Sequence, residues 1–172
     1  MTDQLGEIET CYTITFKRRS KHPAARLWRA LTEPEEAAQW LEGSVSIDLR
    51  VGGSYTLFAE TEKPEACVIV RIHSERSLTY VWGMSRPAAW GDRLSVVDWQ
   101  IEPDGDGCTY TFVHNGCADR GEGEEGLAAG WHGFLDQFDA HLDGVCISAD
   151  EGKEAWERRH TPYLERLTAA VR

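Results

Sequence analysis

Aromatic side chains are the residues of this chain that are best able to form a binding site. Seven tryptophans occur among 172 residues, and aromatic rings offer a large apolar surface, with a polar edge in tryptophan and tyrosine. Pockets for small molecules are mostly apolar and contain a few polar groups that fix orientation. We therefore expect an aromatic-lined cavity, and its candidate residues are Tyr55, Tyr80, Trp82, Trp90, Trp99, Tyr110, Phe112, His114, Phe134 and Phe138.

Ordinary core packing is the alternative interpretation of these rings. We favour it for Trp28 and Trp131, which lie on apolar helical faces. Both interpretations stay open for Trp82, Trp90 and Trp99, because the sequence does not fix which strand faces point into a cavity.

Histidine and tyrosine would supply the polar groups of such a cavity. Tyr80, Tyr110 and His114 would orient a ligand if their strand faces point inward, and the charge of His114 can change near neutral pH. For His114 we favour a simpler role, a strand-end histidine bonded to backbone or water. His132 and Asp136 could share a metal ion, but no third ligand is evident, and we favour a solvent-exposed helix face. We expect neither a metal nor a cofactor.

Catalytic motifs are absent from the sequence. It contains no GxSxG, no HExxH, no phosphate-binding P-loop and no GxGxxG followed by an acidic partner. The five cysteines are scattered and form no CxxC pair, which favours reduced thiols over a zinc or redox site. We therefore predict no catalytic residues.

Composition and charge limit the partners. Hydrophobic residues make up 41% and charged residues 27%, as in an ordinary globular domain, and the net charge is −11. An excess of acidic residues argues against nucleic acid, whose phosphates are neutralised by clustered Lys and Arg. The N-terminus resembles no secretory signal and no apolar run approaches the roughly 20 residues that span a bilayer. These features predict a cytoplasmic protein without a membrane partner.

The elements that must position the aromatic residues follow from periodicity. A strand over residues 8–16 precedes two short helices, one from Ala24 to Leu31 and one ending near Trp40. Six short strands joined by turns are then predicted at 45–49, 54–60, 67–73, 78–84, 94–102 and 108–114. Apolar residues at three- and four-residue intervals from Leu127 predict an amphipathic helix of about five turns.

Glycine, proline and capping residues add detail near the C-terminus. Gly130 and Gly133 weaken the amphipathic helix, and we expect them to allow close approach of another element. Ser148 and Glu151 have the spacing of a capping box, which predicts a further helix in the extension 148–172. Thr161-Pro162 should restart or kink that helix.

Several motifs occur together in one order. They are RLWRALTEPEEAAQW at 26–40, RVGGSY at 50–55, LTYVW at 78–82, WQIEPDGDGCTYTFVHNG at 99–116 and GWHGFLDQFDAHL at 130–142. In this order they resemble the bacterial proteins related to the activator of heat-shock-protein-90 ATPase, which belong to the START-like, Bet v 1-like (SRPBCC) superfamily. The resemblance covers about residues 8–146. Departures are Ala66, where the family usually has glycine, and the extension 148–172, which lies beyond the common domain end.

The resemblance implies an α+β helix-grip fold. A curved antiparallel sheet would surround the long C-terminal helix in the order βααββββββα, with a cavity between sheet and helix. We expect residues 1–147 to form this domain and residues 148–172 to form a helical extension of it. The eukaryotic activator has an additional chaperone-binding domain for which this chain has no room, so activation of the chaperone's ATPase is not implied.

Three functions follow as hypotheses. The first is non-catalytic binding of a small apolar or aromatic molecule in the cavity, with the loops 85–92 and 117–126 as its gate. The second is an enzyme of the polyketide cyclase or aromatase type that uses the same cavity, since fold alone does not fix function. The third is a protein-interaction module, either a chaperone-cofactor-like protein or a homodimer formed through the extension, where Trp156, Tyr163, Leu167 and Val171 trace a helical stripe.

Overall fold

The computed structural model describes residues 11–41, 43–82, 95–118 and 124–170. The elements in chain order are β1 (Cys11–Ser20), α1 (Ala24–Thr32), α2 (Pro34–Trp40), β2 (Val45–Ile47), β3 (Ser54–Leu57), β4 (Glu65–His73), β5 (Ser77–Trp82), β6 (Ser95–Asp104), β7 (Gly107–Ala118), α3 (Glu124–Leu142) and α4 (Ala149–Ala170). Within the described residues, seven strands form one antiparallel sheet in the order β1-β7-β6-β5-β4-β3-β2. The predicted order of elements is thereby confirmed.

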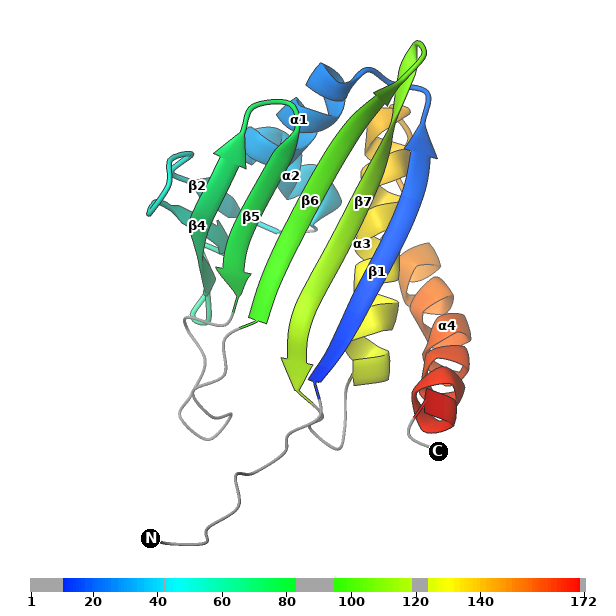
Figure 1. Ribbon diagram of the computed structural model, residues 1–172. Coiled ribbons are helices and arrows are strands. Elements are labelled where there is room, and N and C mark those ends of the chain that lie inside the picture. Colours follow the sequence, from blue (N-terminus) through cyan, green and yellow to red (C-terminus); the bar gives the residue numbers. More distant parts are fainter. Residues whose placement is uncertain (1–10, 42, 83–94, 119–123, 171–172) are drawn as a thin grey trace, which may run out of the picture.

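Three helices cover one face of the sheet. Figure 1 shows α1, α2 and α3 behind the strands, with α4 packed beside α3 near the edge formed by β1. The first strand and the last strand of the meander, β1 and β7, pair along their whole length from Cys11↔Ala118 to Ser20↔Cys108. The sheet therefore surrounds α3 in the predicted helix-grip arrangement.

The hairpin between β6 and β7 sits where the turn residues predict it. Asp104 pairs with Gly107, and Gly105 in the turn has a φ of +61°, a conformation that glycine adopts without strain. Gly107 is required for a second reason, since a Cβ atom there would lie 2.3 Å from the carbonyl oxygen of Ser20. The turn thus sets the register between β6 and β7, and Gly107 allows the close contact with the end of β1.

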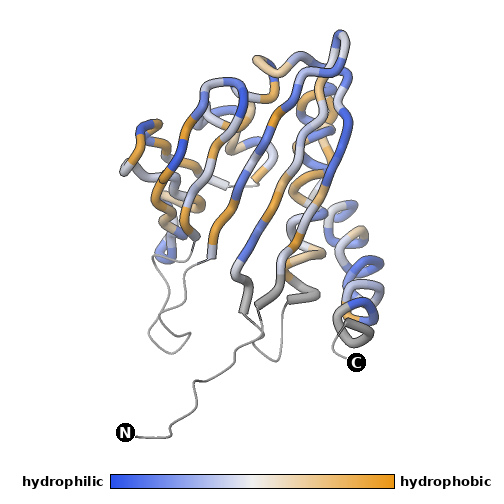
Figure 2. The backbone as a smooth tube through the Cα atoms, in the orientation of Figure 1, coloured by the Kyte–Doolittle hydropathy of each residue, from blue (hydrophilic) through white to orange (hydrophobic). Residues whose placement is uncertain are grey.

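Alternation along the strands separates the core from the outer face (Figure 2). In β6, Val97, Trp99 and Ile101 are buried, while Asp98 on the opposite face pairs with Arg71 of β4. The helix α3 supplies the other half of the core with a stripe at helical spacing. That stripe consists of Trp131, Leu135, Phe138 and Leu142.

The C-terminal extension forms a helix that begins at the predicted capping box. The backbone N–H of Ser148 donates to Glu151, and the backbone N–H of Glu151 donates to the Ser148 hydroxyl oxygen. Of the two alternatives for Thr161-Pro162, a restart is wrong, because α4 runs from Ala149 to Ala170 with Pro162 inside it, and a kink stays a prediction. No helix among the described residues is long and apolar enough to cross a membrane.

Candidate functional site

Most of the candidate residues lie on the inner face of the sheet or on the face of α3 opposite it. The described candidates on the strands are buried, Phe138 of α3 is buried, and Phe134 of α3 is partly buried. The strand faces that carry these candidates, which the sequence left undecided, are therefore the buried faces of the sheet. Trp90 and the predicted gate at 85–92 lie outside the described residues.

Packed rings occupy the interior around the middle of α3. The ring of Trp99 lies 5.8 Å from that of Trp40, 5.0 Å from that of Phe112 and 5.4 Å from that of Phe138. Edge-to-face and tilted contacts of this kind are typical of aromatic cores. For Trp99 these contacts favour core packing over cavity lining.

The tyrosine hydroxyls of this interior bond to the protein itself. The Tyr55 hydroxyl donates to the Leu31 carbonyl oxygen at 3.1 Å, and the Tyr110 hydroxyl donates to Asp139 Oδ1 at 2.8 Å. Burial raises the pKa of both phenols above the ordinary value, and it does the same for Tyr80, whose ring stacks on that of Tyr55. These phenols stay neutral, and the hydroxyl groups of Tyr55 and Tyr110 link their strands to α1 and α3.

A different arrangement occurs where β5 ends and β6 begins. Four side chains, Trp82, Ser95, His114 and Trp131, form what we call the indole–imidazole cluster. The Trp82 ring lies 5.6 Å from the His114 ring and 5.4 Å from the Trp131 ring. Trp82 and Ser95 are paired across the two strands, and His114 on β7 is fully buried.

Hydrogen bonds fix the tautomer of His114. The Trp131 indole Nε1–H donates to His114 Nδ1 at 2.9 Å, so Nδ1 must offer a lone pair. The ring proton is then on Nε2, which lies 2.7 Å from Ser95 Oγ and donates to it. Histidine that activates a serine needs a lone pair facing the hydroxyl. His114 in this state therefore positions Ser95 and does not deprotonate it.

Two donors of the cluster have no acceptor among the described residues. Trp82 is 9% exposed, and its indole Nε1–H is buried without a hydrogen-bond partner. The Ser95 hydroxyl accepts from His114 and keeps its own proton for a further acceptor. A buried donor without an acceptor costs about 1–3 kcal/mol. The cluster is thus suited to receive an oxygen or nitrogen acceptor.

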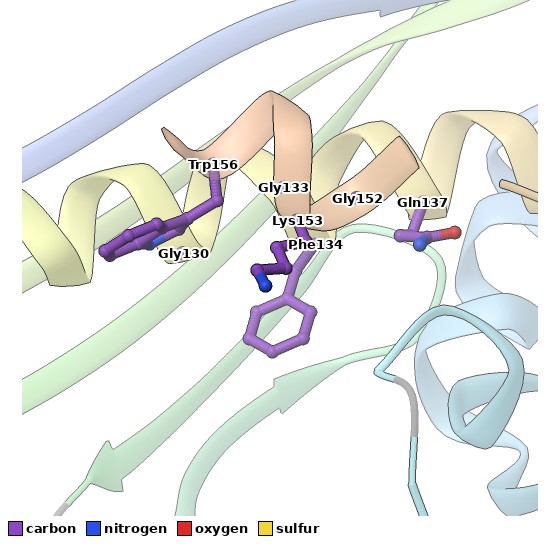
Figure 3. A pocket seen from close by; sticks show the side chains of 7 residues that line it. All are labelled: Gly130, Gly133, Phe134, Gln137, Gly152, Lys153 and Trp156. Atoms are coloured by element: carbon purple, nitrogen blue, oxygen red, sulfur yellow. The ribbon is translucent and has the colours of Figure 1, made fainter. Parts of the chain in front are cut away.

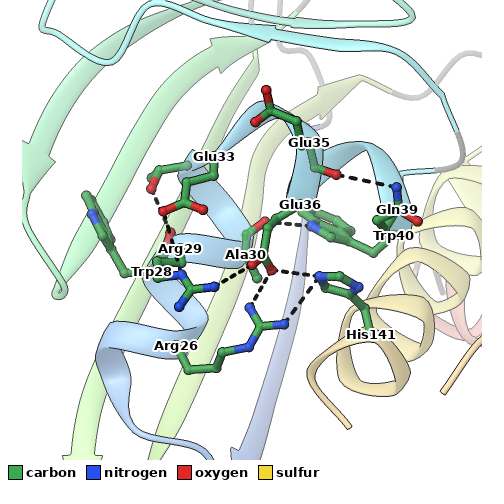
Figure 4. A network of polar contacts seen from close by, with 11 residues as sticks. Arg26, Trp28, Arg29, Ala30, Glu33, Glu35, Glu36, Gln39, Trp40 and His141 are labelled. Carbon is green, nitrogen blue, oxygen red and sulfur yellow. Dashed lines mark hydrogen bonds and ion pairs between the residues drawn. The ribbon is translucent and has the colours of Figure 1, made fainter. Parts of the chain in front are cut away.

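The opposite end of α3 is held by an ion-pair network (Figure 4). Glu36 of α2 accepts from His141 Nε2 at 2.8 Å, from Arg29 Nη2 at 2.7 Å and from Arg26 Nη1. Burial acts to raise the pKa of Glu36, but the hydrogen bonds from His141, Arg29 and Arg26 outweigh it and lower the pKa to about 2. The network joins α1, α2 and α3.

The outer face of α3 differs from the prediction of a solvent-exposed surface. Asp136 forms ion pairs with Arg18 of β1 and Arg159 of α4, and His132 accepts or donates a hydrogen bond with the Tyr163 hydroxyl at 2.8 Å. Burial and then the charge of Arg159 lower the pKa of His132. This face is covered because α4 packs on it. Among the described residues no three possible metal ligands cluster.

Ser95 is a member of the indole–imidazole cluster that the sequence interpretation missed. By alternation along β6 it lies on the same buried face as Val97 and Trp99. Extending that alternation by one step toward the strand start would have included it. Its pairing with His114 depends on strand register and could not be inferred from spacing.

The architecture is that of a helix-grip protein, and comparison with known proteins identifies the family. Residues 21–143 match the model of the family "Activator of Hsp90 ATPase homolog 1-like protein". Because the match spans well over half of the chain, this protein belongs to that family, and the predicted resemblance is confirmed. A search of curated proteins by sequence gives no match.

Solved structures share the fold. CalU16 from Micromonospora echinospora is 22% identical with a TM-score of 0.70, and the alignment covers 89% of this chain and 86% of that one. MLL2253 from Mesorhizobium loti is 25% identical with a TM-score of 0.68, covering 79% of this chain and 100% of that one. DynU16, described as a putative protein in the dynemicin biosynthetic locus, is 22% identical with a TM-score of 0.61, covering 76% and 47%.

Proposed function

We propose that this protein binds, without covalent chemistry, a small aromatic molecule that carries a hydrogen-bond acceptor. The site would be the indole–imidazole cluster, between the sheet and the N-terminal half of α3. The observation that carries the proposal is the buried indole N–H of Trp82, which has no acceptor among the described residues. A carbonyl or ether oxygen on the ligand would supply one.

The surroundings of this donor suit an aromatic guest. The rings of Trp82 and Trp131 meet edge to face at 5.4 Å and 68°, so the donor has aromatic surroundings of the kind that an aromatic ring prefers. Burial of apolar area contributes about 25 cal/mol per Å2, so an enclosed ring gains several kcal/mol before ordering costs. The Ser95 hydroxyl would act as a second, adjustable donor.

The other hypotheses receive less support from the described residues. A cyclase-like enzyme would need a polar group positioned for proton transfer. His114 turns its Nε2–H, not a lone pair, toward the Ser95 hydroxyl, so this pair is not set up as a base and its acid. Binding is also compatible with the setting of DynU16, since a biosynthetic locus brings proteins into contact with small organic molecules. We therefore retain non-catalytic binding as the proposed function.

The test compares a ketone with its hydrocarbon analogue. We expect Trp82→Phe to weaken binding of 2-acetylnaphthalene about 5- to 10-fold, because it removes the indole donor and keeps an aromatic ring. Binding of 2-ethylnaphthalene, which has no acceptor, should change less than about 2-fold. Isothermal titration calorimetry measures both affinities.

Trp28→Phe is the matched control, since Trp28 has the same 9% exposure but lies on α1. It should leave the preference for the ketone unchanged. The proposal is wrong if wild-type protein binds the ketone and the hydrocarbon with equal affinity. It is also wrong if Trp82→Phe weakens the binding of both compounds equally, because the indole donor then has no role in recognition.

A further inference from the structure

The two helices α3 and α4 enclose a pocket that the indole–imidazole cluster does not use. Its volume is about 270 Å3, near the lower end for small-molecule sites. The residues that line it are Gly130, Gly133, Phe134 and Gln137 of α3 and Gly152, Lys153 and Trp156 of α4. Figure 3 shows Trp156 at one end of the pocket and Gln137 at the other, with Phe134 and Lys153 between them.

Glycine keeps this pocket open. The sequence predicted that Gly130 and Gly133 would permit close approach of another element, and this expectation is wrong, because a Cβ atom at either position would have nothing within 4 Å. Glycine is among the poorest helix formers, and alanine would fit both positions without a clash. Packing therefore does not explain the two glycines, whereas an opening between the helices does.

Aromatic surface and one free cation characterise the lining. Trp156 is 39% exposed although it is a large hydrophobic residue, and Phe134 presents a second ring from α3. Lys153 forms no hydrogen bond or ion pair with any described residue. The acidic residues at helical spacing from it on α4 are Asp150 and Glu157, and neither forms an ion pair with Lys153.

We propose that this pocket is a second binding site, for a planar aromatic carboxylate. The ring of the ligand would lie over Gly130 and Gly133 between Trp156 and Phe134, and its carboxylate would pair with the Lys153 ammonium group. The site is distinct from the indole–imidazole cluster, since it lies between α3 and α4 and selects a negative charge. It does not depend on the function proposed above.

The probe for this site is 2-naphthoate, with the uncharged 2-naphthalenemethanol as its comparison. Binding is followed through the indole N–H resonance of Trp156 in 1H–15N spectra. We expect the double variant Gly130→Ala/Gly133→Ala to bind 2-naphthoate at least about 10-fold more weakly, because two methyl groups occupy the space of the ring. The same variant should melt at least about 2 °C higher, because alanine stabilises a helix relative to glycine.

The charge is tested separately. Lys153→Gln should lower the affinity for 2-naphthoate about 5-fold or more and leave the affinity for 2-naphthalenemethanol unchanged. Lys63→Gln makes the same charge change on an exposed loop, and it should change neither affinity. Trp82→Phe should also leave naphthoate binding intact.

The proposal is overturned if the alanine variant melts higher and still binds 2-naphthoate as wild type does, or if the Trp156 resonance does not respond to 2-naphthoate. If Lys153→Gln lowers the affinity for both probes equally, the Lys153 charge does not select the carboxylate.

Discussion

At the scale of single residues, the polar groups of Glu36 and Trp82 have opposite environments. The Glu36 carboxylate has three donors around it, and these hold its pKa at about 2. The Trp82 indole N–H has no acceptor among the described residues. A satisfied group of the first kind stabilises the fold, and an unsatisfied donor of the second kind is suited to a ligand. This contrast supports a structural role for Glu36 and the binding role that we propose for Trp82.

The low pKa of Glu36 predicts how stability depends on pH. The carboxylate is ionised in the folded protein down to about pH 2, and its ordinary pKa is 4.5. Its contribution is therefore complete above about pH 4.5 and is lost as the pH falls toward 2. Glu36→Gln should lower the free energy of unfolding by roughly 2–3 kcal/mol at pH 7, and this deficit should shrink by pH 3.

Chemical denaturation at the two pH values measures the effect, and Glu35→Gln is the control. Glu35 lies beside Glu36 on the same helix but is exposed, so its substitution should change stability by less than about 0.5 kcal/mol at either pH. An equal deficit for Glu36→Gln at pH 7 and pH 3 would show that the ion pairs contribute no pH-dependent stability.

At the scale of elements, α3 has several faces with different tasks. Trp131 and Phe138 face the sheet, Asp136 faces β1 and α4, and Gly130 and Gly133 face the pocket under α4. Hydrophobic periodicity predicts the first face correctly, because that face is apolar at helical spacing. It fails for the other two, because a covered polar face and a glycine-lined face look like solvent-exposed positions until α4 is placed in space.

The packing around Trp99 predicts that loss of this ring destabilises the fold more than loss of an exposed ring. Trp99→Ala removes a side chain that contacts Trp40, Phe112 and Phe138, and we expect it to destabilise the fold by about 3–5 kcal/mol. Trp156→Ala, at a 39% exposed position on α4, should cost less than about 1 kcal/mol. Thermal unfolding measures both changes. A small loss of stability in Trp99→Ala would indicate that this ring lines a cavity.

At the scale of the whole molecule, the order of elements could be predicted almost completely. The hairpin at Gly105 and the capping box at Ser148 are local signals, and the structure has both where the sequence places them. The contents of the interior could not be predicted, because they depend on which residues meet across β5, β6 and β7. The pairing of Ser95 with His114 is such a case. The division into residues 1–147 and an extension at 148–172 stays a prediction.

The central claim is that the Trp82 indole N–H donates to a ligand held between the sheet and α3. The most direct test is a 1H–15N titration with 2-acetylnaphthalene, in which the Trp82 indole resonance is assigned by its absence from Trp82→Phe. The account predicts a saturable downfield shift of this proton that 2-ethylnaphthalene does not produce. A Trp82 resonance that stays fixed while the ketone binds elsewhere on the protein would contradict it.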